Sequence, residues 1–180
     1  TRCTSSAASD VYKRQVSLSS DGTIVAIGAI YNDGNGSDSG HVRVYQYSDS
    51  SWSQLGSDID GEEANDYSGY FVSLSSDGTI VAIGATGIGA SRGWNTSGYV
   101  RIYEYSNGSW TQLGSDIDGE ASGDNSGHSV SLSSDGTIVA IGAYGNDDNG
   151  NASGQVRVYQ YSNSSWSQLG SDIDGEASND

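Results

Sequence analysis

The chain has 180 residues and carries 23 acidic against 7 basic side chains, which gives a formal net charge of −16. Such a surface repels nucleic acid and anionic membranes, because both are bound through clustered Lys and Arg. The longest apolar stretch, residues 24–27 with their flanking Gly and Ala, is too short to span a membrane. We therefore expect neither nucleic-acid binding nor direct membrane insertion.

The first fifteen residues share nothing with the rest of the chain. Residues 5–15 read SSAASDVYKRQ and resemble the in-frame translation of a transposase-type sequencing adaptor, with residues 1–4 as its index region. We assign residues 1–15 to an adaptor-derived artefact without a fold, the alternative being a natural, divergent N-terminus. This assignment excludes Cys3, the only cysteine of the chain, so no residue remains for disulfide or thiol chemistry.

The remaining chain is built from one repeated unit. The stretch VSLSSDGTIVAIGA occurs unchanged at residues 16–29, 72–85 and 130–143. Such a period indicates an array in which single units cannot bury their own apolar faces. We divide the chain into units at 16–62, 63–120 and 121–180, the first truncated at its start and the last in its connection to a next unit. We therefore expect a fragment of a longer protein.

Each unit contains four strand-like runs, which in the last copy are residues 129–133, 137–143, 155–161 and 165–169. The first and third runs alternate apolar and polar residues, whereas the second is apolar on both faces and rich in β-branched residues. Asp135-Gly136 predicts a hairpin turn in which both central residues have positive φ. The sequence thus predicts an all-β fold, a β-propeller fragment of about three four-stranded antiparallel blades with an incomplete ring. A β-sandwich is the alternative architecture.

The motifs of the last unit carry a family resemblance. Residues 127–131 (GHSVS), Asp135-Gly136, residues 139–143 (VAIGA) and residues 153–159 (SGQVRVY) look like the FG-GAP repeat of integrin-α-type β-propellers. The Trp that opens each fourth strand, at positions 52, 110 and 166, resembles the variant common in secreted microbial proteins. The resemblance covers residues 16–180 and implies a propeller of about six to eight blades, exported or displayed at a cell surface for adhesion or ligand binding.

Two motif positions depart from the family pattern. The usual aromatic-glycine pair before the first strand is replaced by Tyr70-Phe71 in one unit and His128-Ser129 in another. The residue after the invariant stretch is not proline, since Ile30, Thr86 and Tyr144 occupy it, and the chain has no proline at all.

The resemblance raises the question of calcium, because integrin-type blades often hold the ion in the loop between their first two strands. Here that loop is only SSDGT, and its single Asp cannot supply the six or more oxygens that calcium needs. The recurring DIDGE segment and an Asp after it provide weaker calcium candidates: Asp58, Asp60, Asp66, Asp116, Asp118 and Asp124. An extended segment would place both of its Asp side chains on one face and its Ile inward. The favoured interpretation is a connection between blades with Asx bonds to the backbone, so we assign no cofactor.

The loop after the invariant stretch varies most between units, and loops on a rigid scaffold commonly bind ligands. Arg92 and Trp94 stand outside the repeat pattern and are the best individual candidates. The full set of candidate ligand-binding residues is Asp33, Asn35, Asp38, Arg92, Trp94, Asn95, Asn146, Asp147, Asp148 and Asn149. A solvated loop without a ligand is the alternative.

Other recurring side chains are assigned to structure. The Trp of each fourth strand is expected to pack between blades. The Arg at positions 43, 101 and 157 is expected to pair with a neighbouring Asp or Glu. His41 and His128 are not repeated, and no third ligand recurs near either, so we expect no zinc site.

These observations favour a non-enzymatic, extracellular or cell-surface module for binding or adhesion. Its ligand contacts are expected on the variable loops between second and third strands. We expect a protein or glycan at a cell surface as its ligand, and other blades of the same chain as its neighbours. One alternative is the propeller part of a secreted hydrolase or lyase whose active site lies outside this sequence, because fold does not fix function. A structural repeat of a surface coat is the other.

Overall fold

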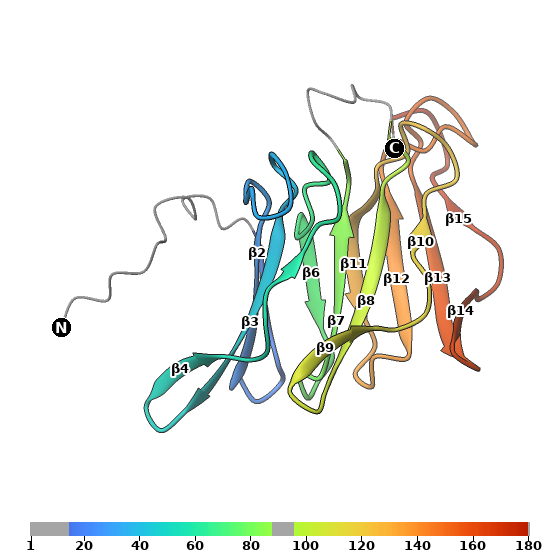
Figure 1. Cartoon of the computed structure of the whole chain (residues 1–180). Helices are drawn as coiled ribbons and strands as arrows, with labels where there is room; N and C mark the ends of the chain where they lie inside the picture. The colour runs from blue at the N-terminus through green and yellow to red at the C-terminus, as the bar shows by residue number, and fades with distance from the viewer. Residues whose placement is uncertain (1–14, 88–95, 180) are drawn as a thin grey trace.

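The computed structural model describes residues 15–87 and 96–179 (Figure 1). Every regular element among these residues is a β-strand. No helix in this part of the chain is long and apolar enough to cross a membrane. The chain is therefore all-β, as its alternating patterns predict.

Three sheets follow one another along the chain, each with four antiparallel strands in sequence order and one short additional strand. The first contains β1 (Gln15–Leu18), β2 (Ile24–Ala29), β3 (His41–Ser48), β4 (Ser51–Gln54) and β5 (Ile59–Asp60). The second contains β6 (Phe71–Leu74), β7 (Ile80–Ala85), β8 (Tyr99–Ser106), β9 (Ser109–Gln112) and β10 (Ile117–Asp118). The third contains β11 (Ser126–Leu132), β12 (Ile138–Ala143), β13 (Gln155–Ser162), β14 (Ser165–Gln168) and β15 (Ile173–Asp174).

The acidic segment of each unit forms the additional strand. Strands β4 and β5 both pair with β3, so the DIDGE segment continues the outer edge of the sheet where the fourth strand ends. The side chain of Ile59 is buried and Asp60 is exposed, which matches the inward Ile expected of an extended segment.

The turn that joins the first two strands differs from the sequence expectation. The glycines Gly22, Gly78 and Gly136 have φ between 71° and 73°, whereas the Asp before each glycine does not have a positive φ. The prediction of a hairpin turn in which both central residues have positive φ is therefore wrong. Ser19 accepts a hydrogen bond from the Gly22 amide and donates its own amide to Ile24, so the turn includes the preceding Ser pair. Asp21 holds it through bonds from the amide and hydroxyl of Thr23.

The hydrophobic core lies between the sheets rather than within one of them. Side chains of blade 1 (Ile24, Ala26, Val42, Val44 and Ile59) form one cluster with side chains of blade 2 (Val72, Leu74, Val81 and Ile83). A second cluster joins blade 2 to blade 3 in the same way. Each sheet therefore depends on its neighbour to cover its apolar face, which is the arrangement of propeller blades.

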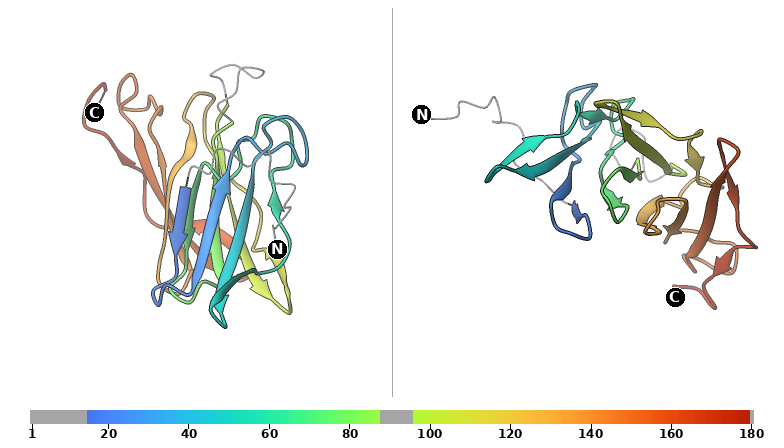
Figure 2. Two further views of the ribbon diagram at one scale, coloured as in Figure 1. Left: turned by 90° about the vertical axis from the view of Figure 1, so that its left-hand side faces the viewer. Right: turned by 90° about the horizontal axis from the view of Figure 1, so that it is seen from below.

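The blades are arranged in an arc, with the hairpins of their first two strands gathered together and their fourth strands splayed apart (Figure 2). Strand β6 lies against β1 and β2, and β11 lies against β6 and β7, so the first strands form the inner side. The three blades leave the ring open, with blade 1 at one end and blade 3 at the other.

Polar bonds repeat across both junctions. The indole N–H of Trp110 donates to the Leu55 carbonyl at 2.7 Å, and that of Trp166 donates to the Leu113 carbonyl at 2.8 Å. The expected packing of these tryptophans between blades is confirmed for the two junctions present. Glycine is also required at the junction between blades 2 and 3, because a side chain on Gly84 would overlap the carbonyl oxygen of Gly127 from the next blade.

Candidate functional site

The variable loops and the acidic connections lie together at one end of the blades, opposite the invariant turns (Figure 1). We call this the loop end and define it by residues 30–40, 61–70, 86–87, 96–98, 119–125 and 144–154. Backbone bonds join the two kinds of segment: the Gly61 amide donates to the Gly40 carbonyl at 2.9 Å, and the Ser68 amide donates to the Ser39 carbonyl at 3.0 Å. Two groups of candidate residues that are separate in the sequence therefore share one surface.

In blade 1 the predicted ligand-binding residues hold their own loop. Asp33 Oδ1 accepts the amide of Asp38 at 2.9 Å. Asn35 Nδ2 donates to the carbonyl of Gly61 at 2.9 Å and so ties the loop to the acidic connection. Burial, together with the negative charge of Asp38, raises the pKa of the Tyr67 phenol. These three candidates are thus already engaged in shaping the loop, while Asp33 and Asn35 remain exposed at its surface.

Blade 3 repeats these bonds. Asp147 Oδ1 accepts the amide of Ala152 at 2.7 Å, and Asn149 Nδ2 donates to the carbonyl of Gly175 at 2.8 Å. Asn146 is buried, and its Oδ1 accepts the amide of Asp148 at 3.1 Å. The predicted candidates Arg92, Trp94 and Asn95 of blade 2 lie outside the described residues.

The acidic connections use their carboxylates for backbone bonds, as the favoured interpretation of the sequence expects. Asp66 is buried, and its Oδ2 accepts the amides of Glu62 at 3.1 Å and Glu63 at 2.9 Å, together with the hydroxyl of Tyr99 at 2.9 Å. Asp124 accepts the amide of Ala121 at 3.0 Å in the next unit. A carboxylate that is bonded in this way through Oδ2 caps a turn of the connection.

Each described Arg pairs with carboxylates, which confirms the structural interpretation of this repeat position. Arg43 bonds Asp58 through Nε and Nη2 and holds the pKa of that carboxyl below its ordinary value. Arg101 bonds Asp116 within its own blade and also reaches Glu62 of the preceding blade at 2.7 Å. Because Arg101 is largely buried, this pair of carboxylates fixes the connection of one blade to the third strand of the next.

The third blade shows the same linkage between blades. Arg157 Nη1 lies 3.6 Å from Glu120 Oε1, and its Nη2 donates to the Asp118 carbonyl at 2.7 Å. The last acidic residue of DIDGE therefore meets the Arg of the following unit at both junctions. With all described arginines engaged and no Lys in the described ranges, the loop end carries an acidic surface.

His41 lies beside two carboxylates that the sequence did not connect with it. Its Nδ1 is 3.7 Å from Asp58 Oδ2 and 3.8 Å from Asp60 Oδ1, and the histidine is buried. Ligand atoms of all three lie within 4.8 Å of one another. The pairing of β5 with the start of β3 brings Asp60 opposite His41, a neighbourhood that the sequence analysis did not identify.

This cluster is nevertheless a poor fit for a metal ion. The two oxygens of Asp58 accept bonds from Arg43 and from Gln54 Nε2, the latter at 2.6 Å. These bonds use the carboxylate lone pairs and place a guanidinium beside any cation. The arrangement is better described as a network at the start of the third strand, in which a buried His41 lies beside partly exposed carboxylates and Arg43.

An aromatic cluster at the inner side of the loop end was missed in the sequence. The rings of Tyr70, Phe71 and His128 lie 5.1 to 5.5 Å apart between centroids, and Tyr144 meets the His128 ring edge-on at 4.5 Å. Tyr144 is half-exposed, whereas its counterparts Ile30 and Thr86 are buried. The available signal was the departure from the family pattern at Tyr70-Phe71, His128 and Tyr144, positions that the structure brings together where blades 2 and 3 meet.

Comparisons with known proteins support the fold and the repeat. A family model for the FG-GAP repeat matches residues 116–159, so the expected resemblance is confirmed for that segment. The invariant stretch inside it is identical in the other two units. No curated protein matches the chain.

Solved structures resemble the chain at low identity. A 6-phosphogluconolactonase, described as putative, from Bacteroides uniformis matches with a TM-score of 0.60 and 15% identity over 93% of this chain and 42% of its own. A hypothetical selenium-binding protein from Sulfolobus tokodaii matches with a TM-score of 0.60 and 14% identity over 92% and 42%. Hydrazine synthase from Kuenenia stuttgartiensis matches with a TM-score of 0.57 and 15% identity over 94% and 39%. The chain thus spans about two fifths of these structures, and the likeness shows the propeller fold alone.

Proposed function

We propose that the chain is a non-enzymatic binding or adhesion module that works outside the cell or at its surface. The FG-GAP repeat at residues 116–159 supports this class of role, since the family resemblance implies export and ligand binding. The hydrogen bonds of the loop end give the proposal further support. They hold loops whose sequences vary between units on a sheet scaffold, and such loops commonly bind ligands.

The observation that carries the proposal is the aromatic cluster of Tyr70, Phe71, His128 and Tyr144. Aromatic side chains supply a large contact area at low cost in conformational entropy, and Tyr and His add a polar tip. The cluster bridges two blades, as ligand sites between structural units commonly do. It replaces small or aliphatic counterparts at equivalent repeat positions, namely Ile30 and Thr86 for Tyr144. A ligand that stacks on these rings would therefore contact blades 2 and 3 together.

The negative charge of the loop end restricts which ligands can bind there. Asp147 and Asp148 are exposed in the loop that follows Tyr144, and the described arginines are engaged with carboxylates. Anionic ligands are repelled by such a surface. A neutral glycan or a protein surface rich in Lys and Arg fits better, since both stack on aromatic rings and the second is also attracted by the acidic loops.

The test is binding of the chain to an array of neutral and acidic glycans and to a set of basic and acidic peptides. We expect a neutral glycan or a basic peptide to bind, and Tyr144→Thr to weaken binding about tenfold or more, because Thr is the residue of the second unit. Tyr47→Thr is the matched control. Tyr47 is as exposed as Tyr144, but it lies near the end of β3, at the end of the blade opposite the loop end. Equal losses in the two variants, or binding to acidic ligands alone, would contradict the proposal.

A further inference from the structure

An aromatic pair lies at the loop end where blade 1 meets blade 2. Tyr31 follows β2 of blade 1, and its ring meets the ring of Tyr67 from blade 2 edge-on, with 5.9 Å between the centroids. Tyr67 is buried, whereas Tyr31 is 44% exposed although both blades of this junction are in place. The pair therefore presents an aromatic side chain to solvent at an internal junction.

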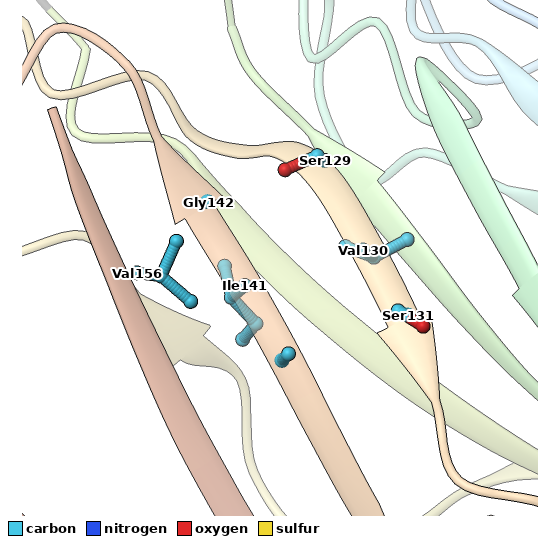
Figure 3. A pocket seen from close by; sticks show the side chains of 7 residues that line it. Ser129, Val130, Ser131, Ile141, Gly142 and Val156 are labelled. Atoms are coloured by element: carbon cyan, nitrogen blue, oxygen red, sulfur yellow. The ribbon is translucent and has the colours of Figure 1, made fainter. Parts of the chain in front are cut away.

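This pair differs from the pocket on the outward face of blade 3. That shallow pocket, of about 200 Å³, is lined by residues of β11 and β12 and by Val156 (Figure 3). Val42, the counterpart of Val156 in blade 1, is fully buried against blade 2. The pocket thus lies where a following blade packs in this fold, and it carries no site.

A carboxylate joins the aromatic pair. The Tyr67 amide donates to the Asp38 carbonyl at 3.1 Å, which places Asp38 of blade 1 beside Tyr67. Burial raises the pKa of the Tyr67 phenol, and the negative charges of Asp38 and Tyr31 raise it further, so the three polar groups lie close together. Asp33 Oδ1 accepts the Asp38 amide at 2.9 Å and brings a second carboxylate to the loop. Phenol and carboxylate oxygens are therefore gathered on one surface.

The repeat does not require this set of side chains. At the junction between blades 2 and 3, the same positions carry smaller residues, namely Gly87 for Tyr31, Thr96 for Asp38 and Asn125 for Tyr67. That junction forms a core of the same kind. The packing of blades therefore explains neither the two tyrosines nor the carboxylate.

The backbone at Tyr67 supports the same conclusion. Its φ is 54°, a left-handed conformation that bulky side chains rarely adopt, and its counterpart Asn125 has nearly the same φ of 55°. Asn tolerates this conformation better, because its short polar side chain can bond locally. Strained residues cluster at positions that hold ligands, so a Tyr where Asn fits indicates a role in binding.

We propose that Tyr31, Tyr67, Asp38 and Asp33 form a binding site for the ammonium group of a Lys side chain on a protein partner. An ammonium group has three N–H donors, and the phenol and carboxylate oxygens of the site can accept them. The exposed Tyr31 ring also attracts a cation through its face. The inference rests on the proposed function, because it names the ligand class for a second contact on the same loop end.

The chain contains a similar combination that is completed by its own cation. The Tyr99 hydroxyl donates to Asp66 Oδ2 at 2.9 Å, and the Arg101 guanidinium lies over the Tyr99 ring at 4.6 Å. Each described Arg pairs with carboxylates of the acidic connections, and the described ranges contain no Lys. A ligand is therefore the natural source of a cation for the Tyr31–Tyr67 site.

The test uses two short peptides that differ only in one charge, the first with Lys and the second with Nε-acetyl-lysine between Gly and Ser residues. Calorimetric titration of the full chain at low salt should show tighter binding of the Lys peptide, and the preference should shrink as salt screens the charges. Asp38→Asn should reduce this preference about fivefold, because Asn tolerates the left-handed backbone and removes the charge. Tyr31→Leu should reduce it about threefold, since Leu lacks the aromatic face.

Asp49→Asn is the matched control. It removes the same charge from an exposed turn at the other end of blade 1, where Asn107 and Asn163 occupy the equivalent positions with the same left-handed backbone. This variant should keep the full preference for Lys. Tyr67→Asn provides a second variant of the site, because Asn occupies this backbone conformation in blade 3, and it should also lower the preference.

The variant Tyr144→Thr separates this inference from the proposed function. If Tyr144→Thr weakens binding of the Lys peptide while Asp38→Asn and Tyr31→Leu do not, the proposed function stands and the ammonium site is overturned. A preference that Asp38→Asn and Tyr67→Asn lower and that Tyr144→Thr leaves intact supports the ammonium site independently of the aromatic cluster. Equal binding of the two peptides, an equal loss in Asp49→Asn, or equally tight binding of a trimethyl-lysine peptide would overturn it.

Discussion

Leu74 and Leu18 occupy the same position of the same invariant stretch, one at an internal junction and the other on an end face. Leu74 is buried against the preceding blade, and Leu18 is exposed because no blade precedes it in the described chain. The local backbone is the same, since both residues end the first strand of a four-stranded sheet. The contrast teaches that the repeat encodes the strand locally, whereas its contribution to stability comes from the neighbouring blade.

The largest expected effect separates these two leucines. Leu74→Ala should lower the free energy of unfolding by about 3 kcal/mol, because it removes a buried side chain and leaves a cavity between blades. Leu18→Ala should change it by less than about 0.5 kcal/mol in dilute solution, since its side chain is already hydrated. Urea denaturation of both variants measures the difference. Equal losses would mean that the junction is not the source of stability.

A pair of glycines tests the closeness of the backbones at a junction. Gly84→Ala places a methyl group against the carbonyl of Gly127, which is backbone and must move, and should cost about 2 kcal/mol. Gly142→Ala in blade 3 meets only the side chain of Ser129, which can rotate, and should cost less than about 1 kcal/mol. Thermal unfolding of the two variants gives the comparison. A larger loss at Gly142 would show that the close approach of the backbones at Gly84 and Gly127 is not the main constraint at this repeat position.

The repeat tryptophans should differ by a hydrogen bond. Trp110→Phe loses the indole bond to the Leu55 carbonyl and should cost about 1 kcal/mol. Trp52→Phe removes an indole from a half-exposed site and should be close to neutral. Chemical denaturation monitored by circular dichroism measures both, because it does not depend on the mutated fluorophore. A neutral Trp110→Phe would show that the indole bond is dispensable.

The smallest expected effect is a loss of stability in acid. Hydrogen bonds from Arg101 lower the pKa of Asp116 in the folded chain, below its ordinary value of 3.8. A carboxyl with a lowered folded pKa contributes stability that is present above the unfolded pKa and disappears as the pH falls through the folded one. Stability should therefore be constant from about pH 7 to pH 5 and decline below about pH 4.

Asp116→Asn should flatten this decline, as measured by denaturation midpoints against pH. Asp172→Asn is the matched control in blade 3, where Arg157 bonds Glu120 and the Asp118 carbonyl, and Asp172 accepts a bond from Gln168. The control should leave the profile closer to that of the unchanged chain. An equal change in both variants would show that the ion pair of Arg101 with Asp116 does not contribute more than other carboxylates to the loss of stability in acid.

Much of the fold follows from local pattern. The four strands of the last unit were expected at 129–133, 137–143, 155–161 and 165–169, and β11 to β14 cover these ranges to within a few residues. Alternation, β-branched runs and turn residues act over a few positions, so a single unit suffices to read them. The turn geometry was mistaken because Ser19, a residue outside the Asp-Gly pair, closes the turn.

The site was harder to predict because it depends on contacts between distant positions. The pairing of Arg101 with Glu62 crosses from one blade to the next, and the sequence indicated only that some acidic partner exists. The cluster of Tyr70, His128 and Tyr144 combines residues from two units whose relative position comes from packing. In contrast, the Asx bonds of Asp66 could be expected, since they are formed within a few residues.

The most direct test of the account measures the exchange of the indole protons of the three repeat tryptophans by nuclear magnetic resonance. The variant Trp94→Phe simplifies the assignment of their signals. In dilute solution the indoles of Trp110 and Trp166 should exchange slowly, because each is bonded across a junction. The indole of Trp52 should exchange fast, because this side chain is half-exposed. Fast exchange at Trp110 and Trp166, or equally slow exchange at Trp52, would contradict an array of blades that is held together by its internal junctions.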